Sequence, residues 1–396
     1  MMRENLSRSK GLQFGMKKKV NFLHKAIEMP KNKQFVLPML CILLLYSCKP
    51  SDVNTHSPTL PFKIITTQHL FTVATPDSKN IWVGGYKSSI MHSSDGGTTW
   101  KTQKCNTSSD ICSISFIDSN TGWAVGKEGT ILSTTNGGET WSIRKSPTNN
   151  HLFSVYFVDK NNGWAVGNFA IVVHTIDGGA TWVDQHQEVR KPLDAQLKKD
   201  NTVLVLKPQD PTFNAIHAVD PDHVWIVGEY GTILYSSNGG DSWQMQECRD
   251  IYPVVSEKEW ISPVPSLYSA YFTNKNNGWA VGMDGVVLRT TNGGKNWKKL
   301  SSPVAEEKPT LYRVKAIGNK AWAVGQYGEY IFSFDGGDNW QRGTGLLLTR
   351  RWLRDMDFAD ENFGIAAGES GTIVCTRDGG KNWTMLSGMP LRPTDF

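Results

Sequence analysis

The sequence lacks the local patterns by which many enzymes and cofactor-binding proteins are found. It contains no Gly-rich phosphate loop and no His-x-His pair, and its nine histidines show no spacing typical of metal ligands. No set of Ser, His and Asp that would form a nucleophilic triad is evident from the sequence alone. These absences favour a non-enzymatic protein with no metal and no other cofactor, and they leave an enzyme as the less favoured alternative.

The apolar segment near the N-terminus is too short for a membrane-spanning helix. Residues 35–46 are twelve in number and include Pro38, whereas a helix needs about 20 apolar residues to cross a bilayer. Lysines precede this segment, and Ser47 and Cys48 follow it, which resembles a bacterial lipoprotein signal. The resemblance implies a signal peptide over residues 1–47, lipidation of Cys48 and an exported, membrane-anchored protein. An ordinary cleaved signal and a retained anchor are the alternatives, and translation starts at Met1 or at Met16.

The basic charge of the chain is confined to this N-terminal segment. The formal net charge is +5, but residues 1–47 hold nine Lys and Arg against two Asp and Glu. The remaining chain carries 33 basic and 35 acidic side chains. A net charge this close to zero excludes general binding to nucleic acid. Residues 48–61, rich in Ser, Thr, Asn and Pro, predict a flexible tether, and the repetitive domain covers 62–396.

Two motifs repeat through this domain. A turn of the form Asp/Asn-Gly-Gly-x-polar-Trp occurs seven times, beginning at Asp95, Asn136, Asp177, Asn238, Asn292, Asp335 and Asp378 and ending at Trp100, Trp141, Trp182, Trp243, Trp297, Trp340 and Trp383. A Trp-x-x-Gly motif precedes each turn, with Ile365 in the Trp position of the last copy. The two positions are 18 residues apart in all seven copies, which indicates a hairpin of constant length.

Alternating, β-branched segments lie between and around these motifs. Residues 130–134 and 152–157 are examples, and each repeat holds four such segments. Four antiparallel strands repeated seven times predict an all-β fold, a seven-bladed β-propeller of four-stranded blades. How the ring closes stays open, because residues 62–68 are available to pair with the last blade.

The turn residues are expected to be structural. Their first side chain accepts backbone N–H groups, their glycines allow positive φ, and their Trp covers the hairpin. Four copies use Asp and three use Asn, and a turn acceptor needs only the shared oxygen, whereas a metal ligand or general base needs the charge.

At these residues the chain resembles two known groups. The turn is similar to the Asp-box of sialidases and related propellers. The repeat Gly122-Trp123-Ala124-Val125-Gly126, followed by Gly129-Thr130-Ile131-Leu132 and Asn136-Gly137-Gly138, is similar to the photosystem II stability and assembly factor family with its BNR-type repeats, over about residues 67–386. That resemblance implies a non-enzymatic scaffold, expected to be a monomer, that binds a membrane-associated protein partner.

Members of that family in phototrophs carry an arginine-rich surface patch. The nearest arginines of this chain lie around the innermost strands of the last two predicted blades, and no residue-by-residue match to the family patch exists; they are Arg313, Arg350, Arg351 and Arg354. They are either solvated or ion-paired arginines at blade edges or a patch that binds a partner.

Two insertions mark where the copies differ. They lie near residues 183–212 and 244–266, before the fourth and fifth predicted blades, on the face that usually binds ligands in propellers. Tyr252 and Trp260 of the second insertion either anchor a partner or pack the insertion against the rim.

The same face is expected to present polar and aromatic side chains around the channel mouth, namely Tyr86, Glu128, Phe169, Tyr230, Asp284, Tyr327 and Glu369, with Glu229 close by. Convergent carboxylates there would suit a carbohydrate-active enzyme, and a glycan-binding propeller is the related alternative. No Arg-Ile-Pro segment of the sialidase type is present, so the carboxylates are expected to be exposed turn residues.

The cysteine spacing predicts one disulfide. Cys105 and Cys112 are separated by six residues between the first two predicted blades, and in an exported protein that spacing can close a bridge. Cys248 has no evident partner, and Cys375 lies in a predicted strand, where it is expected to be a buried apolar residue.

Overall fold

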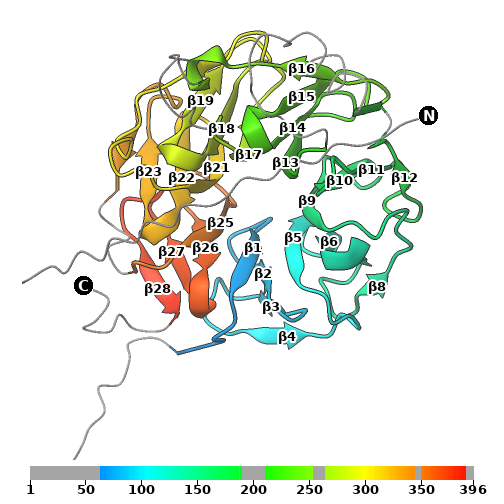
Figure 1. The fold of residues 1–396 in the computed structure, drawn as a ribbon. Coiled ribbons are helices and arrows are strands. Elements are labelled where there is room, and N and C mark those ends of the chain that lie inside the picture. The colour runs from blue at the N-terminus through cyan, green and yellow to red at the C-terminus, as the bar shows by residue number, and fades with distance from the viewer. Residues whose placement is uncertain (1–62, 187, 190–209, 253–263, 344–348, 389–396) are drawn as a thin grey trace, which may run out of the picture. The chain divides into compact units, whose positions relative to one another are not determined.

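The computed structural model describes residues 63–186, 188–189, 210–252, 264–343 and 349–388. These residues belong to one unit, Leu60–Phe396. They form seven four-stranded antiparallel sheets, and each sheet is made of four consecutive strands. Figure 1 shows the seven sheets as blades around a common centre. The prediction of a seven-bladed β-propeller is confirmed.

The strands occupy four concentric positions. The innermost strands are β1 (Leu70–Ala74), β5 (Ile111–Phe116), β9 (Leu152–Phe157), β13 (Phe213–Ala218), β17 (Leu267–Phe272), β21 (Leu311–Ile317) and β25 (Leu353–Phe358). The second strands are β2 (Ile81–Gly85), β6 (Gly122–Gly126), β10 (Gly163–Gly167), β14 (Val224–Gly228), β18 (Gly278–Gly282), β22 (Lys320–Gly325) and β26 (Gly364–Gly368).

The third and fourth strands complete each blade toward the rim. The third strands are β3 (Ile90–Ser93), β7 (Ile131–Thr134), β11 (Val172–Thr175), β15 (Ile233–Ser236), β19 (Val287–Thr290), β23 (Tyr330–Ser333) and β27 (Ile373–Thr376). The outermost strands are β4 (Lys101–Gln103), β8 (Ser142–Ile143), β12 (Val183–Asp184), β16 (Gln244–Gln246), β20 (Lys298–Lys299), β24 (Gln341–Arg342) and β28 (Thr384–Ser387).

Two faces follow from this antiparallel order. The turns between second and third strands and the links between blades share one face, named here the link face; the other two turns of each blade share the opposite face. Five of the link-face turns are 3₁₀ turns, η1 (Lys127–Gly129), η2 (Glu229–Gly231), η4 (Met283–Gly285), η5 (Gln326–Gly328) and η6 (Glu369–Gly371), and η3 (Arg249–Ile251) follows β16.

The two sequence motifs contact each other across blade boundaries. In five blades the Trp of Trp-x-x-Gly donates its indole N–H to a glycine carbonyl in the Asp/Asn-Gly-Gly turn of the next blade, whereas the indole N–H of Trp279 has no hydrogen-bond partner. The pairs are Trp82 with Gly137, Trp123 with Gly178, Trp164 with Gly239, Trp225 with Gly293 and Trp322 with Gly379. Because each Trp is buried and also makes this bond, it fastens one blade to its neighbour.

An aromatic stack reinforces four of the blade boundaries. A Phe at the end of the innermost strand stacks on the Trp of the preceding blade, with ring centroids 3.5 Å apart for Trp123 and Phe157 and 3.8 Å for Trp225 and Phe272. The Trp of the turn meets the same Phe edge-on, as Trp182 meets Phe157 at 5.8 Å. Truncating a buried aromatic side chain of this kind costs about 3–5 kcal/mol.

The seven turns make the bonds expected of structural turns. In each, the first side chain accepts the backbone N–H of the residue four positions later, at 2.8 Å for Asp95 and Thr99 and at 3.0 Å for Asn136 and Thr140. The remaining acceptors are Asp177, Asn238, Asn292, Asp335 and Asp378. Six of the seven turn Trp side chains are buried, and Trp100 is partly buried.

The ring closes through side chains of the last blade. Asp355 Oδ2 accepts the Val73 N–H at 2.8 Å, and Asp357 Oδ2 accepts the Thr75 N–H at 2.9 Å. Residues 63–68 form no strand in the structure, but the Ile65 N–H donates to Ser387 Oγ of β28 at 3.1 Å. The first and last blades are therefore joined by these two aspartates and by a shared apolar core that includes Val73 and Ile365, and not by a strand that they share.

The predicted disulfide is wrong. Cys105 and Cys112 are both free. The Cys105 thiol is buried and donates to the Ser88 carbonyl at 3.1 Å, because the link that carries it folds over the turn between β2 and β3. Cys112 lies in β5, at the channel. Cys375 is buried, as expected, and Cys248 is a free buried thiol.

Candidate partner-binding face

Each link-face turn holds two consecutive residues in the left-handed conformation, and the second is Ser88 in the first blade, Ala170 in the third and Gly in the other five. The first of the two has a φ between 52° and 58°, at Lys87, Glu128, Phe169, Tyr230, Asp284, Tyr327 and Ser370. Tyr86 and Glu369, predicted to lie around the mouth, are one residue earlier in their turns. Two consecutive left-handed residues suit a two-residue hairpin turn, because their twist matches that of the flanking strands.

Several of these turn side chains are large, apolar and exposed. Phe169 is 59% exposed and Tyr327 is 67% exposed. Tyr86 and Met283, one residue before the central turn position of their blades, are also exposed, and Tyr230 is partly buried. The link face therefore offers separate apolar side chains from five blades around the channel mouth.

A ring of partly exposed residues lies inside these turns. It consists of the second residue of each innermost strand, is named here the mouth ring, and contains Phe71, Cys112, Phe153, Asn214, Tyr268, Tyr312 and Arg354. The Arg354 guanidinium lies over two aromatic side chains of the mouth ring, 4.7 Å from the Tyr312 centroid and 5.3 Å from the Tyr268 centroid. Burial raises the pKa of the Cys112 thiol to about 11 and also raises the pKa of Tyr312. Both groups therefore stay neutral at pH 7, and Arg354 is the charged residue of the mouth ring.

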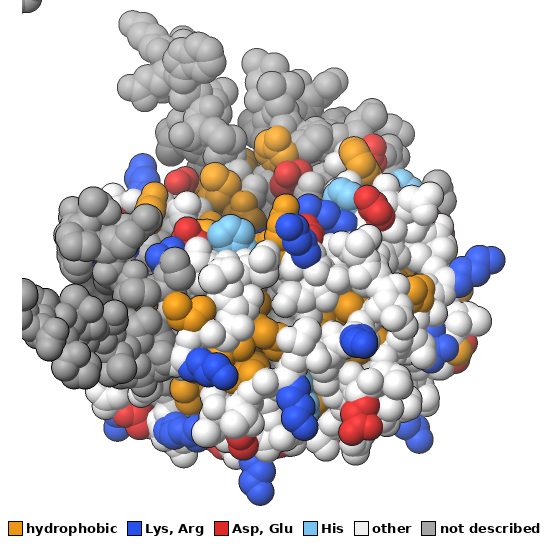
Figure 2. All heavy atoms as spheres, turned by 90° about the horizontal axis from the view of Figure 1, so that it is seen from below, with side chains coloured by type: hydrophobic (Ala, Val, Ile, Leu, Met, Phe, Trp, Pro, Cys, Tyr) orange, Lys and Arg blue, Asp and Glu red, His pale blue; other side chains and the backbone are white. Residues whose placement is uncertain are grey.

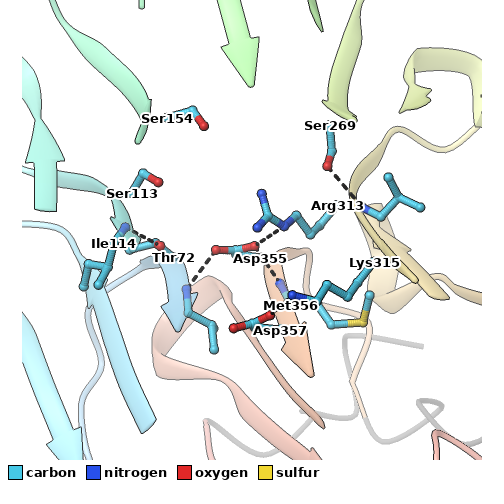
Figure 3. A network of polar contacts seen from close by, with 12 residues as sticks. Thr72, Ser113, Ile114, Ser154, Ser269, Arg313, Lys315, Asp355, Met356 and Asp357 are labelled. Carbon is cyan, nitrogen blue, oxygen red and sulfur yellow. Dashed lines mark hydrogen bonds and ion pairs between the residues drawn. The ribbon is translucent and has the colours of Figure 1, made fainter. Parts of the chain in front are cut away.

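The four predicted arginines do not form one patch. Arg313 points into the channel, where its Nε lies 3.0 Å from Asp355 Oδ1 (Figure 3). Arg351 lies 3.9 Å from Glu369, Arg354 belongs to the mouth ring, and Arg350 is exposed in the link before β25. Arg313 thus fits the interpretation as an ion-paired arginine, whereas Arg350 and Arg354 lie where a partner can reach them.

Both insertions start and end on the link face. The Ala170 N–H donates to the Pro211 carbonyl at 2.9 Å, so the first insertion returns against the turn of the third blade. Ile251 and Val264, at the two ends of the second insertion, lie against Gly231 of η2. Tyr252 is partly buried and packs against the core of blades four and five. Residues 190–209 and Trp260 lie outside the described residues.

The acidic side chains of the link face do not converge on one site. Glu229 accepts the Thr212 N–H at 2.8 Å, Glu369 faces Arg351, and Glu128 and Asp284 are exposed in the turns of different blades. Within the described part of the chain, no group of three His, Cys, Asp or Glu side chains is placed to hold a metal ion. The same part contains no helix that is long and apolar enough to cross a membrane.

The rim carries mixed charge and two grooves. Figure 2 shows one side of the rim, where basic and acidic side chains alternate with hydrophobic ones and no field of one sign forms. A polar groove of about 730 Å³ lies between blades four and five, and an apolar one of about 620 Å³ lies between β28 and the first blade. The charge pattern agrees with the near-neutral composition of the repetitive domain.

A family model decides the relationship of this chain to known proteins. The model described as "Photosynthesis system II assembly factor YCF48" matches residues 44–132, 98–200 and 259–346, which together span more than half of the chain. The chain belongs to the YCF48 family. A search of curated proteins found no match.

Solved structures agree with this family at the level of the fold. A YCF48 structure bound to a D1 peptide is 20% identical, with a TM-score of 0.60, over 80% of this chain and 95% of that chain. YCF48 from Cyanidioschyzon merolae is 19% identical, with a TM-score of 0.61, over 80% and 97%. The GH74 xyloglucanase from Xanthomonas campestris is 12% identical, with a TM-score of 0.62, over 82% of this chain and 55% of that chain.

Apart from Arg313, the sequence analysis did not single out the side chains that line the channel. Aligning the innermost strands at their third residue places Thr72, Ser113, Ser154 and Ser269 beside Ala215, Arg313 and Asp355. The change from small hydroxyl residues to an arginine and an aspartate in the last two blades was the available signal. It is visible only when the repeats are aligned on these strands.

Proposed function

We propose that this protein is a non-enzymatic assembly scaffold that binds a segment of a membrane-associated protein at the link face. The observation that carries the proposal is the set of exposed aromatic side chains around the channel mouth, chiefly Phe169 and Tyr327. Aromatic residues are enriched among the side chains that dominate protein interfaces. The mouth ring, with Arg354 over two tyrosines, extends this surface toward the channel axis.

The backbone of these turns supports a binding role. A non-Gly residue in the left-handed conformation costs about 1–2 kcal/mol, and Gly or Asn would occupy it at lower cost. The exposed side chains of Phe169 and Tyr327 bury little apolar surface in return. All seven link-face turns share this conformation, so Phe169 and Tyr327 are distinguished by the large exposed aromatic side chain that they carry there, which suits contact with a partner.

Membership in the YCF48 family supports a protein partner over the carbohydrate-active alternative. The solved YCF48 structure bound to a D1 peptide shows that a propeller of this family takes a peptide segment as its ligand. We carry over to this chain a peptide segment as the ligand class. The xyloglucanase likeness concerns the fold alone, and the scattered carboxylates of the link face give the enzyme alternative no site.

The location of the protein is part of the same proposal. We propose export and anchoring through lipidated Cys48, on the pattern of residues 35–48, so that the propeller acts as a monomer at a membrane surface.

Two matched double variants test the binding face. Phe169→Asn with Tyr327→Asn removes the exposed aromatics and suits the left-handed backbone, so it should not destabilise the fold. Ile176→Asn with Phe334→Asn removes exposed apolar side chains, 70% and 44% exposed, from the opposite face. Each full-length protein is used to recover partners from membranes after cross-linking.

We expect the link-face variant to lose a discrete membrane-protein partner, with affinity at least about tenfold weaker, and the opposite-face variant to keep it. Equal recovery with both variants would contradict the proposed face. If no protein is recovered while the purified propeller binds or cleaves a glycan, the scaffold function is wrong.

A further inference from the structure

The channel below the mouth ring contains a polar cavity. Its volume is about 270 Å³, and its lining includes Ser113, Ser154, Tyr156, His217, Arg313 and Lys315. One water molecule takes about 30 Å³ of the liquid, so the cavity has room for a small ligand with several waters. None of these residues belongs to the turns or to the mouth ring.

Each of the two carboxylates beside this cavity already has three partners. Asp355 accepts the Val73 and Met356 N–H groups, both at 2.8 Å, and faces Arg313. Asp357 accepts the Thr75 N–H at 2.9 Å and the Phe358 N–H at 3.0 Å, and its Oδ1 lies 2.8 Å from Lys315 Nζ. Figure 3 shows both carboxylates turned toward β1 and toward the two cations.

The hydroxyl groups of the lining are left as donors. Ser113 Oγ accepts the Val155 N–H at 3.2 Å, and Ser154 Oγ accepts the Ile216 N–H at 3.3 Å. Neither hydroxyl donates a hydrogen bond to a described residue. Burial raises the pKa of Tyr156 to about 12, so its hydroxyl keeps its proton at neutral pH. Three hydroxyl hydrogens therefore remain for a ligand or for water.

His217 adds a buried donor with no partner. Its Nδ1 accepts the Phe272 N–H at 3.4 Å, so the proton of the neutral ring is on Nε2. Nε2 is buried without a hydrogen-bond partner, and the residue is 4% exposed. Burial, followed by the charges of Lys315 and Arg313, lowers the pKa of His217 well below its usual value, which keeps the ring neutral. A buried N–H without an acceptor costs about 1–3 kcal/mol.

Arg313 and Lys315 also have N–H groups that their carboxylate partners do not accept. The Arg313 guanidinium meets Asp355 through Nε, and its terminal nitrogens point into the channel (Figure 3). Lys315 uses one of its three N–H groups on Asp357, and its Nζ also lies 4.9 Å from the Tyr271 ring centroid. The charged groups around the cavity that keep unused hydrogen-bonding capacity as donors are thus Arg313 and Lys315, beside the neutral hydroxyls.

We propose that the channel cavity binds a small oxyanion, either an inorganic one such as phosphate or sulfate or the carboxylate of a small acid. An oxyanion accepts from Arg313, Lys315, Tyr156, the two serines and His217 Nε2, and so supplies the acceptors that the protein lacks there. Arg354 in the mouth ring adds positive charge on the route from the link face. The proposal is independent of the partner-binding function.

Phosphorus NMR of inorganic phosphate with the full-length protein tests this site directly. Line broadening at constant ionic strength should be saturable, and sulfate should reverse it. Acetate as a second competitor distinguishes the two kinds of oxyanion. Displacement of phosphate by acetate identifies a site for carboxylates, and displacement by sulfate alone identifies a site for inorganic oxyanions.

Two conservative variants locate the bound phosphate. Arg313→Lys keeps a cation beside Asp355 but removes the guanidinium donors, and phosphate should bind at least about tenfold more weakly. Tyr156→Phe keeps the ring contact with His217 and removes one donor, with about threefold or greater loss. Tyr235→Phe, on the rim of the fourth blade, is the control and should bind normally.

An unchanged phosphate line at every concentration would overturn the proposal and leave a water-filled channel. Broadening of equal size in all three variants would overturn it too, because the phosphate would then be bound at surface lysines.

Discussion

Single residues explain why Asp and Asn are interchangeable in the repeated turns. Asp177 bonds the Thr181 hydroxyl and backbone N–H, whereas Asn136 accepts the backbone N–H of Thr140 and donates its own amide to the Thr140 hydroxyl. Both side chains close the same turn, with the hydroxyl reversing its role. The stability of the two kinds of turn should therefore differ only at low pH, because an Asp side chain can be protonated there and an Asn side chain cannot.

A first prediction concerns the acid stability of the Asp turns. The hydrogen bonds from Thr99 and Thr181 lower the pKa of Asp95 and of Asp177 to about 2. An Asp with a lowered folded pKa contributes stability that is present above its unfolded value, about 3.9, and is lost as the pH falls toward 2. The Asp95→Asn, Asp177→Asn double variant should match the natural protein at pH 7 and lose less stability between pH 4 and pH 2.

Urea unfolding at pH 7, 4 and 2.5 measures this difference. The corresponding change at an exposed Asp outside the Asp/Asn-Gly-Gly turns, Asp284→Asn on the link face, is the control and should leave the difference between pH 4 and pH 2 as it is in the natural protein. A parallel loss of stability in the natural protein and the double variant would contradict the assigned role of the turn carboxylates.

At the scale of elements, the side chain at the end of an innermost strand and the side chain paired with it at the start of the next strand are matched in size. In the third blade, Phe157 pairs with Gly163, and a Cβ atom on Gly163 would lie 2.5 Å from the Phe157 ring. In the fourth blade the corresponding pair is Ala218 and Val224. A large residue on one strand therefore requires a glycine on the other.

A double-mutant cycle tests this exchange of volume. Gly163→Val alone should destabilise by about 1–3 kcal/mol through overpacking, and Phe157→Ala alone by about 3–5 kcal/mol. The double variant copies the fourth blade and should cost less than the sum of the two single changes by about 1–3 kcal/mol. Strictly additive costs in thermal or urea unfolding would contradict the matching.

Ring closure is a property of β25 and its neighbours. Asp357→Ala removes the acceptor of the Thr75 N–H and leaves Lys315 unpaired in the channel, so we expect a loss of about 3–5 kcal/mol. The paired change Asp357→Leu with Lys315→Met leaves no uncompensated charge and should cost less than Asp357→Ala. If the single aspartate change proves as mild as a surface substitution, closure does not depend on this ion pair.

At the scale of the whole molecule, the anchor is a prediction of the sequence that labelling can test. Cells expressing the full chain with a fatty-acid analogue should incorporate the label into the natural protein but not into Cys48→Ser, which should be released from the membrane fraction. Cys41→Ser, within the predicted signal, is the control and should be labelled normally. Label that persists in Cys48→Ser would contradict the assigned lipidation site.

The number of blades, the order of the strands and the chemistry of the turns could be predicted from the sequence alone. These features are local and repeated: the Trp-x-x-Gly position and the turn Trp are 18 residues apart in every copy, so one repeat interprets the others. The sequence also indicated which face varies, because the insertions interrupt an otherwise constant spacing.

The contacts between repeats and the side chains that line the channel could be read only from the folded propeller. Trp82 bonds a glycine 55 positions away, and Asp355 bonds a backbone N–H 282 positions away, distances that no local pattern specifies. The same holds for the free thiols of Cys105 and Cys112, since each thiol is directed by the fold of its own surroundings and not by their spacing. Contacts between repeats depend on how the blades pack around the ring, and that packing exists only in the closed propeller.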